Sequence, residues 1–221
     1  MANTLFLRLE GPLQAWGERA RWSVRDTCTE PTKSGVVGLL GCALGLTADE
    51  DLKKLSENIK MGIRCDKQGT FLTDFHTVVG GVLNAEGKIK ADTMLSYRSY
   101  LSDASFLVAL QSSIEQVSRL GFALKNPVWP YYLGRRACVP SKPIYEGEGN
   151  FPDLRSALQE WPYQYSSGKH EKGETLRAVI EVRPGEGIQR HDELFSNKRR
   201  IFLPRYTCEV LILPKLSQEV E

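Results

Sequence analysis

The chain has 221 residues and a mass of 24.8 kDa, which allows one large core with insertions and does not require two domains. Hydrophobic residues make up 41% and charged residues 25%, a composition that excludes a disordered or fibrous protein. The net charge of +2 is too small to indicate a nucleic-acid partner, so any cationic surface must be local.

Cysteine content and hydropathy indicate a cytoplasmic protein. The five cysteines are widely spaced, form no CxxC pair and follow no signal peptide, as is typical of a reducing compartment. The longest apolar run, at residues 36–46, contains three glycines, whereas a membrane-spanning helix needs about 20 apolar residues. We therefore expect no membrane role.

The first elements along the chain are predicted in the order strand, helix, helix, strand. Alternating apolar residues predict a strand at residues 4–9. Thr32 or Ser34 can cap a helix over residues 35–46, whose repeated glycines indicate close packing against a sheet. The next two elements are an amphipathic helix over residues 49–59 and a strand over residues 61–65.

Residues 74–100 predict a long β-hairpin. Two extended runs of mixed polarity flank residues 84–87, which suit a four-residue turn. Neither run is apolar enough to build a core, and an isolated two-stranded ribbon is only marginally stable in water. We therefore expect the hairpin to need a partner.

The second half predicts another strand and helix, an ordered loop, and two final strands. The loop, at residues 126–150, is rich in proline, glycine and aromatic residues. Together the elements predict an α+β fold, a ferredoxin-like or RRM-type sandwich with the hairpin inserted. The ranges are a strand at 104–110, a helix at 112–124, a short helix at 152–161, and strands at 176–182 and 206–213.

No metal or cofactor site is predicted. The three histidines are far apart, and no cysteine or carboxylate stands at ligand spacing beside them. The chain also lacks a GxxxxGK[ST] phosphate loop and a GxSxG nucleophile elbow. These absences argue against nucleotide hydrolysis and acyl transfer.

The segment PYYLGRR at residues 130–136 combines groups that bind nucleic acid. Arg135 and Arg136 can fork onto phosphates, Tyr132 can stack on a base, and Gly134 permits close backbone approach. A solvated loop with one tyrosine in the core explains the same residues equally well.

Two further places pair cations with groups suited to nucleic acid. Lys33 and Ser34 stand at a helix start, where free amides attract anions, although simple capping would also explain them. Tyr97 and Arg98 lie at the base of the hairpin, where strand alternation places them on opposite faces.

Several motifs in order resemble the CasD family of type I-E CRISPR Cascade complexes. The resemblance runs from the first strand to about residue 150 and is weaker beyond it. The motifs are GPLQAWG at residues 11–17, PTKSG with its GLLG continuation from residue 31, DFHTV at 74–78, YLSDASF at 100–106 and YLGRR at 132–136.

The resemblance implies one RNA-binding domain over residues 1–221, a ferredoxin-like palm whose hairpin is a thumb. It implies that the palm grips the five-prime handle of the CRISPR RNA, that the thumb packs on a backbone subunit, and that the large subunit docks nearby. Target DNA would be an indirect partner. The residues it favours for RNA contact are Trp16, Lys33, Arg98, Arg135 and Arg136, although Trp16 and Tyr132 could instead be core or interface residues.

Two other functions stay open. A related type I-C branch cuts precursor CRISPR RNA without metal, and His76 could serve as the general base or acid of such an endoribonuclease. No second base or lysine at matching positions supports it, so we expect no catalysis. A protein-interaction module without RNA contact is the third reading, and it requires the arginine loop and the hairpin base to be covered by protein.

Overall fold

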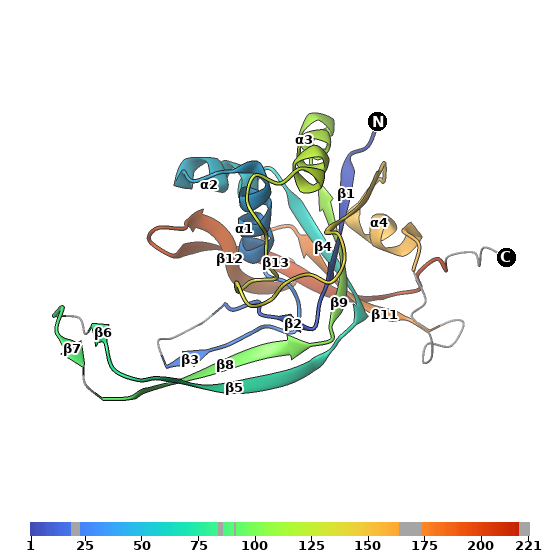
Figure 1. The fold of residues 1–221 in the computed structure, drawn as a ribbon. Coiled ribbons are helices and arrows are strands. Elements are labelled where there is room, and N and C mark those ends of the chain that lie inside the picture. Colours follow the sequence, from blue (N-terminus) through green and yellow to red (C-terminus); the bar gives the residue numbers. More distant parts are fainter. Residues whose placement is uncertain (19–22, 84–85, 91, 164–173, 217–221) are drawn as a thin grey trace.

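A seven-stranded antiparallel sheet lies at the centre of the computed structural model, which describes residues 1–18, 23–83, 86–90, 92–163 and 174–216 (Figure 1). The α+β class predicted from the sequence is confirmed. In order across the sheet the strands are β10 (Tyr145–Gly149), β1 (Thr4–Glu10), β9 (Ser105–Gln111), β4 (Lys60–Lys67), β11 (Leu176–Val182), β13 (Ile201–Ile212) and β12 (Ile188–Ser196).

Helices cover both faces of this sheet. The side chains of β1 alternate, so Leu5 and Leu7 join the larger core under α1 (Lys33–Leu44) and α3 (Ile114–Lys125). Phe6 points the other way, into a smaller core under α4 (Leu154–Glu160). A further helix, α2 (Asp49–Glu57), packs beside α1 and against β12.

Helix α1 has the Thr32 cap that its sequence predicts, but it begins and ends two residues earlier than the predicted range of 35–46, and its glycines do not contact the sheet. The hydroxyl of Thr32 caps the first turn, and Gly45 ends the helix in the left-handed conformation with φ of 70°. A Cβ added at Gly38 would meet no atom within 4 Å, and one added at Gly41 would meet Leu52 of α2. The interpretation that these glycines let α1 pack close to the sheet is therefore wrong.

The predicted hairpin is present and longer than expected. Its arms are β5 (Thr70–Val78) and β8 (Met94–Ser102), which pair over their full length, and a short ribbon of β6 (Val82–Leu83) and β7 (Ile89–Lys90) continues toward the tip. Figure 1 shows the arm reaching well beyond the helices. Part of the expected turn, residues 84 and 85, lies outside the described residues.

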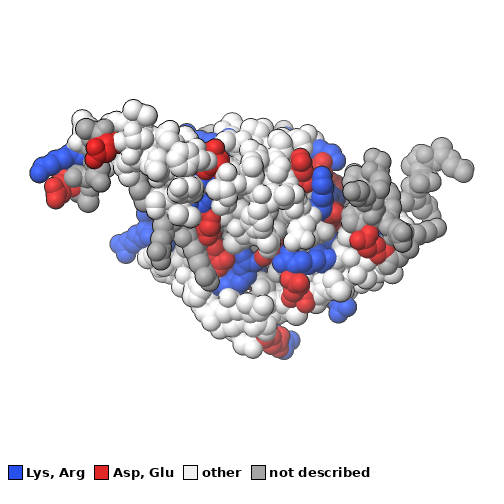
Figure 2. Space-filling view, turned by 90° about the horizontal axis from the view of Figure 1, so that it is seen from below, with Lys and Arg blue, Asp and Glu red and all other residues white. Residues whose placement is uncertain are grey.

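Two short strands tie the hairpin to the rest of the chain. Strand β2 (Leu13–Gln14) pairs antiparallel with Leu101 and Ser102 at the end of β8, and β3 (Val24–Arg25) pairs parallel with Tyr97 and Arg98 of the same strand. Seen from below, the surface along the hairpin is mostly uncharged, and charged side chains gather at its tip (Figure 2).

Three strand assignments in the second half were incomplete. Strands β10 and β12 were not predicted from the sequence, and β13 begins five residues before the predicted start of the last strand. Both missed strands lie at the edges of the sheet, where one side of the ladder is open and charged residues are tolerated. Register shifts interrupt both edge pairings, β12 with β13 and β10 with β1, and such irregular strands lack a clean alternation.

All five cysteines are free thiols. Among the described residues, no helix is both long enough and apolar enough to span a membrane.

Candidate functional site

The base of the hairpin gathers cationic and aromatic side chains on two faces. On one face Tyr97 is 45% exposed, and its ring meets the edge of Phe75 at 5.5 Å between centroids. On the other face Arg98 stands opposite Asp74 in the strand register. The buried Nε of Arg98 has no hydrogen-bond partner in the described structure.

Arg135 reaches this base from the loop between α3 and β10. Its Nη2 donates to the carbonyl oxygens of Arg25 and Asp26 at 2.9 and 3.1 Å, and its guanidinium lies 4.7 Å from the ring centroid of Tyr100. Its Nη1 is buried and, within the described part of the chain, unpaired. Arg135 therefore fastens residues 25 and 26 to the palm. Its neighbour Arg136 is exposed.

Gly134 allows two loops to meet. The amide of Ala15 donates to the carbonyl oxygen of Leu133 at 3.0 Å, and Gly134 has φ of 91°. A Cβ at Gly134 would lie 1.7 Å from the Ala15 oxygen, so only glycine fits. The preceding Tyr132 is half-buried. The glycine thus serves chain packing here.

Trp16 belongs to the core. It is 1% exposed, its Nε1 donates to Gln14, and its ring packs over Gly35 of α1. Of the two roles that the sequence left open, the structure favours core packing, because a buried indole presents no face on which a base could stack.

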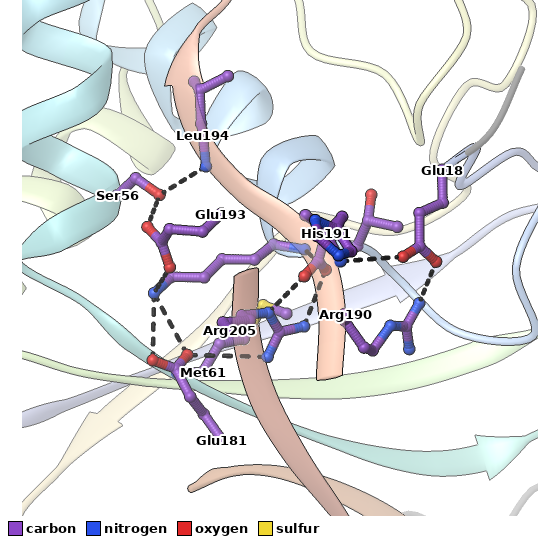
Figure 3. Close-up of polar contacts among 12 residues, drawn as sticks. Glu18, Ser56, Met61, Glu181, Arg190, His191, Glu193, Leu194 and Arg205 are labelled. Carbon is purple, nitrogen blue, oxygen red and sulfur yellow. Dashed lines mark hydrogen bonds and ion pairs between the residues drawn. The ribbon is translucent and has the colours of Figure 1, made fainter. Parts of the chain in front are cut away.

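Lys33 is likewise buried, at 2% exposure, and its ammonium pairs with Glu181 at 3.3 Å and Glu193 at 2.5 Å. Figure 3 shows both glutamates and Arg205 converging between β11 and β12. Because its charge is already balanced inside the protein, this position does not fit the phosphate contact predicted for Lys33. Its backbone amide is also occupied, by Asp192 at 2.8 Å.

Ser34 differs from Lys33 because it is partly exposed and lines a cleft of about 330 Å³ along the glycine side of α1. The cleft brings together the loops that carry Trp16 and Gly134, and none of its lining residues is charged. It suits a neutral group better than a phosphate.

His76 stands on the hairpin face that carries Arg98, opposite Ser96 and two residues beyond Asp74. It is half-buried. Among the described residues, no group of three or more His, Cys, Asp and Glu could hold a metal ion.

Strand β3 is a part of this site that was not predicted from the sequence. Two residues are too few for a periodicity signal, and the segment reads as a polar loop. Only tertiary pairing places Arg25 beside Arg98.

Comparisons with known proteins agree on one group. Residues 4–207 match the family described as CRISPR-associated protein (Cas_Cas5). The chain is 38% identical over 171 residues to the "CRISPR system Cascade subunit CasD" of Escherichia coli (strain K12), covering 72% of this chain and 76% of that protein.

Two solved structures are also similar. One, titled "Crystal structure of Cas protein", matches with a TM-score of 0.72 and 36% identity over 96% of this chain and 98% of that one. Another, titled "CRISPR RNA-guided surveillance complex", matches with a TM-score of 0.78 and 29% identity over 95% of this chain and 90% of that one.

Proposed function

We propose that this chain, which belongs to the Cas5 family of CRISPR-associated proteins, is a subunit of a type I-E Cascade surveillance complex and binds the five-prime handle of the CRISPR RNA without cutting it. The observation that carries the RNA contact is the hairpin base. There strand β3 gathers three groups suited to RNA: Arg98 and the exposed Tyr97 pair with it in the register, and Arg135 binds the carbonyl oxygen of its residue Arg25.

The finer fold is a ferredoxin-like palm with a thumb. The chain visits β1, α1, β4, β9, α3 and β10 in turn, and these strands lie in the order β10, β1, β9, β4. A βαββαβ path with that neighbour order supports the ferredoxin-like assignment. The hairpin is inserted between β4 and β9, which supports reading it as a thumb.

Phosphates are the expected ligands of the arginines. Arg98, Arg135 and Arg136 come from the hairpin and the loop before β10, so a strand of RNA passing between these elements would meet donors from both sides. Tyr97 offers a ring face for an unstacked base.

The apolar residues of the hairpin favour a protein partner. They stay exposed in the isolated chain, and an arm of this kind becomes stable when another surface covers it. We propose that a Cascade backbone subunit covers them, that the large subunit docks nearby, and that target DNA is met only through the assembly. The exposed residues of the hairpin arms are Phe71 at 56%, Phe75 at 54%, Leu72 at 47% and Leu95 at 46%, and Val24 of the adjoining strand β3 is 48% exposed.

The cytoplasm is the proposed compartment. Five free thiols, two of them buried, fit a reducing environment.

The test incubates the purified chain, without metal, with end-labelled repeat RNA and analyses one set of samples by filter binding and denaturing gel. We expect retention of intact RNA. A double variant, Arg98→Ala with Arg136→Ala, should weaken retention and reduce the slope of log affinity against log salt by about 0.7 for each phosphate that the variant no longer neutralises.

Arg155→Ala is the matched control, because that arginine is exposed on α4. Equal losses in the control and the double variant would contradict the site. Metal-free cleavage of the repeat RNA, abolished by His76→Ala, would instead establish the endoribonuclease.

A further inference from the structure

The segment that joins Trp16 to Cys28 is fastened to itself at its two ends. The amide of Cys28 donates to the carbonyl oxygen of Trp16 at 2.8 Å, and the amide of Trp16 donates to the hydroxyl of Thr27 at 2.8 Å. Because Trp16 is buried in the core, the base of the segment has a fixed position. We refer to its described residues, 17–18 and 23–27, as the strap.

The far part of the strap is built into the hairpin base. Its strand β3 pairs with β8, where Val24 faces Tyr97 and Arg25 faces Arg98 in the register. The amide of Tyr97 donates to the Ser23 carbonyl at 2.8 Å. Arg135 holds the next two carbonyls of the strap, so the residues proposed for RNA contact depend on where the strap lies.

The near part of the strap is held by the C-terminal strands through Glu18 (Figure 3). One carboxylate oxygen of Glu18 accepts from Nη2 of Arg190 at 3.2 Å, and the other accepts from the backbone amide of His191 at 3.2 Å. The thiol of Cys28 also points at Glu18, at 3.4 Å. Burial raises the pKa of this thiol to about 12, so it keeps its proton and can donate.

Arg190 bridges the strap to the start of α1. Besides Glu18 it pairs with Glu30, which is 4% exposed and also binds Arg177 of β11. Burial opposes the charge of Glu30, but hydrogen bonds from Thr29 and Arg177 and the charge of Arg190 outweigh it, and the pKa of Glu30 lies below its usual value. The side chain of Arg190 is 12% exposed, so its charge is largely desolvated and depends on both carboxylates.

From this geometry we infer that Arg190 is a positioning residue for the guide-RNA site: it fastens Glu18 to strand β12, and the contact of Glu18 with the Cys28 thiol passes this anchorage to the part of the strap that follows β3, which fixes β3 against the hairpin base. This role rests on the proposed function and gives the strands β11 to β13 a part in RNA binding. Arg190 itself touches no RNA. It acts through Glu18, β3 and the two arginines at the hairpin base.

The experiment compares Arg190→Gln, Glu18→Gln and the double variant in the full chain. Two quantities are measured: the hydrogen-exchange rate of the Tyr97 amide, and the affinity for end-labelled handle RNA by filter binding. We expect each single variant to speed exchange at the Tyr97 amide and to weaken RNA binding about tenfold. The double variant should lose little more, because each substitution breaks the same contact between Glu18 and Arg190.

Arg183→Gln is the matched control, since that arginine is exposed just after β11. It should leave both quantities unchanged. If Arg190→Gln does not fold, Glu18→Gln alone tests the role of Arg190. It breaks the contact between Glu18 and Arg190 and leaves the ion pair between Arg190 and Glu30 in place.

The two readouts separate the inference from the proposed function. Faster exchange at Tyr97 in a chain whose wild type binds no handle RNA would support the fastening and overturn the proposed function. Unchanged exchange and RNA affinity in Glu18→Gln, or losses that add fully in the double variant, would overturn the role of Arg190.

Discussion

The central sheet and the hairpin are both antiparallel β-structure, yet they bury their side chains very differently. On the central strand β9, every residue from Ser105 to Leu110 is buried, on both faces. On β5 of the hairpin, the first six residues are all exposed, two phenylalanines among them. The sheet buries apolar side chains on both faces, whereas the hairpin leaves apolar side chains exposed, as is typical of a surface that another molecule covers.

The largest loss is expected from Asp66→Asn, in the interior of the sheet. Arg8 and Arg64 each place a nitrogen 2.6 Å from this carboxylate, and all three side chains are nearly inaccessible. Removing the carboxylate leaves two buried cations without their shared partner, at a cost of about 3–5 kcal/mol in the free energy of unfolding.

Urea unfolding measures this effect. Glu86→Gln is the control at the hairpin tip, where Glu86 and Lys88 form an exposed pair, and its midpoint should match that of the wild type. If the urea midpoint fell equally in both variants, the sheet and the hairpin would not differ in their contribution to stability.

A matched pair of leucines tests the same contrast with apolar side chains. Leu110 of β9 is fully buried, so Leu110→Ala should lower the free energy of unfolding by about 2–5 kcal/mol. Leu95 of β8 is 46% exposed, and Leu95→Ala should change it by less than about 0.5 kcal/mol. A large loss from Leu95→Ala in chemical denaturation would show that the hairpin contributes to the stability of the isolated chain.

Acid should destabilise the central sheet, because Asp192 becomes protonated and loses its charge. Burial opposes its charge, but the hydrogen bonds and charge of Arg205 outweigh burial and hold the pKa of Asp192 below its usual value. A lowered folded-state pKa contributes stability that is fully present above about pH 4 and is lost as the pH falls through the folded pKa.

Thermal unfolding between neutral and acid pH checks this. Asp192→Asn should be less stable at neutral pH and should lose less stability on acidification than the wild type. Parallel acid profiles for Asp192→Asn and the wild type would contradict the prediction.

The smallest effect concerns two glycines. Gly38 lies inside α1 with free space around its Cα, so Gly38→Ala should stabilise the chain by about 0.5–1 kcal/mol. Gly81 in the hairpin also has free space but adopts φ of 74°, so Gly81→Ala should not stabilise it. Differential scanning calorimetry resolves the difference, and a gain in both variants would mean that backbone conformation at Gly81 has no influence.

Local patterns predicted the regular elements well. Strand alternation at residues 4–9, the Thr32 cap and the helical spacing over residues 112–124 each correspond to an element of the structure. The missed edge strands β10 and β12 show the limit of this approach, because an edge strand is defined by its neighbour and carries charges freely.

The candidate site was less accessible to sequence reasoning. Lys33 and Trp16 carry the chemistry of RNA contact, but burial depends on residues far away in the sequence, such as Glu181 and Glu193 for Lys33. Arg98 and Arg135 were predicted separately, and only the fold places both beside β3. Residue type therefore identified candidate groups, and tertiary contacts decide which of them can meet a ligand.

The register shifts at both edges of the central sheet have a consequence for the chain before assembly. A regular open edge is a template on which another polypeptide can add a strand, and this is a common start of aggregation. Here β10 and β12 each break the hydrogen-bonding ladder near the open edge. We expect these interruptions to keep newly made chains apart, so that the exposed arm can find its intended partner.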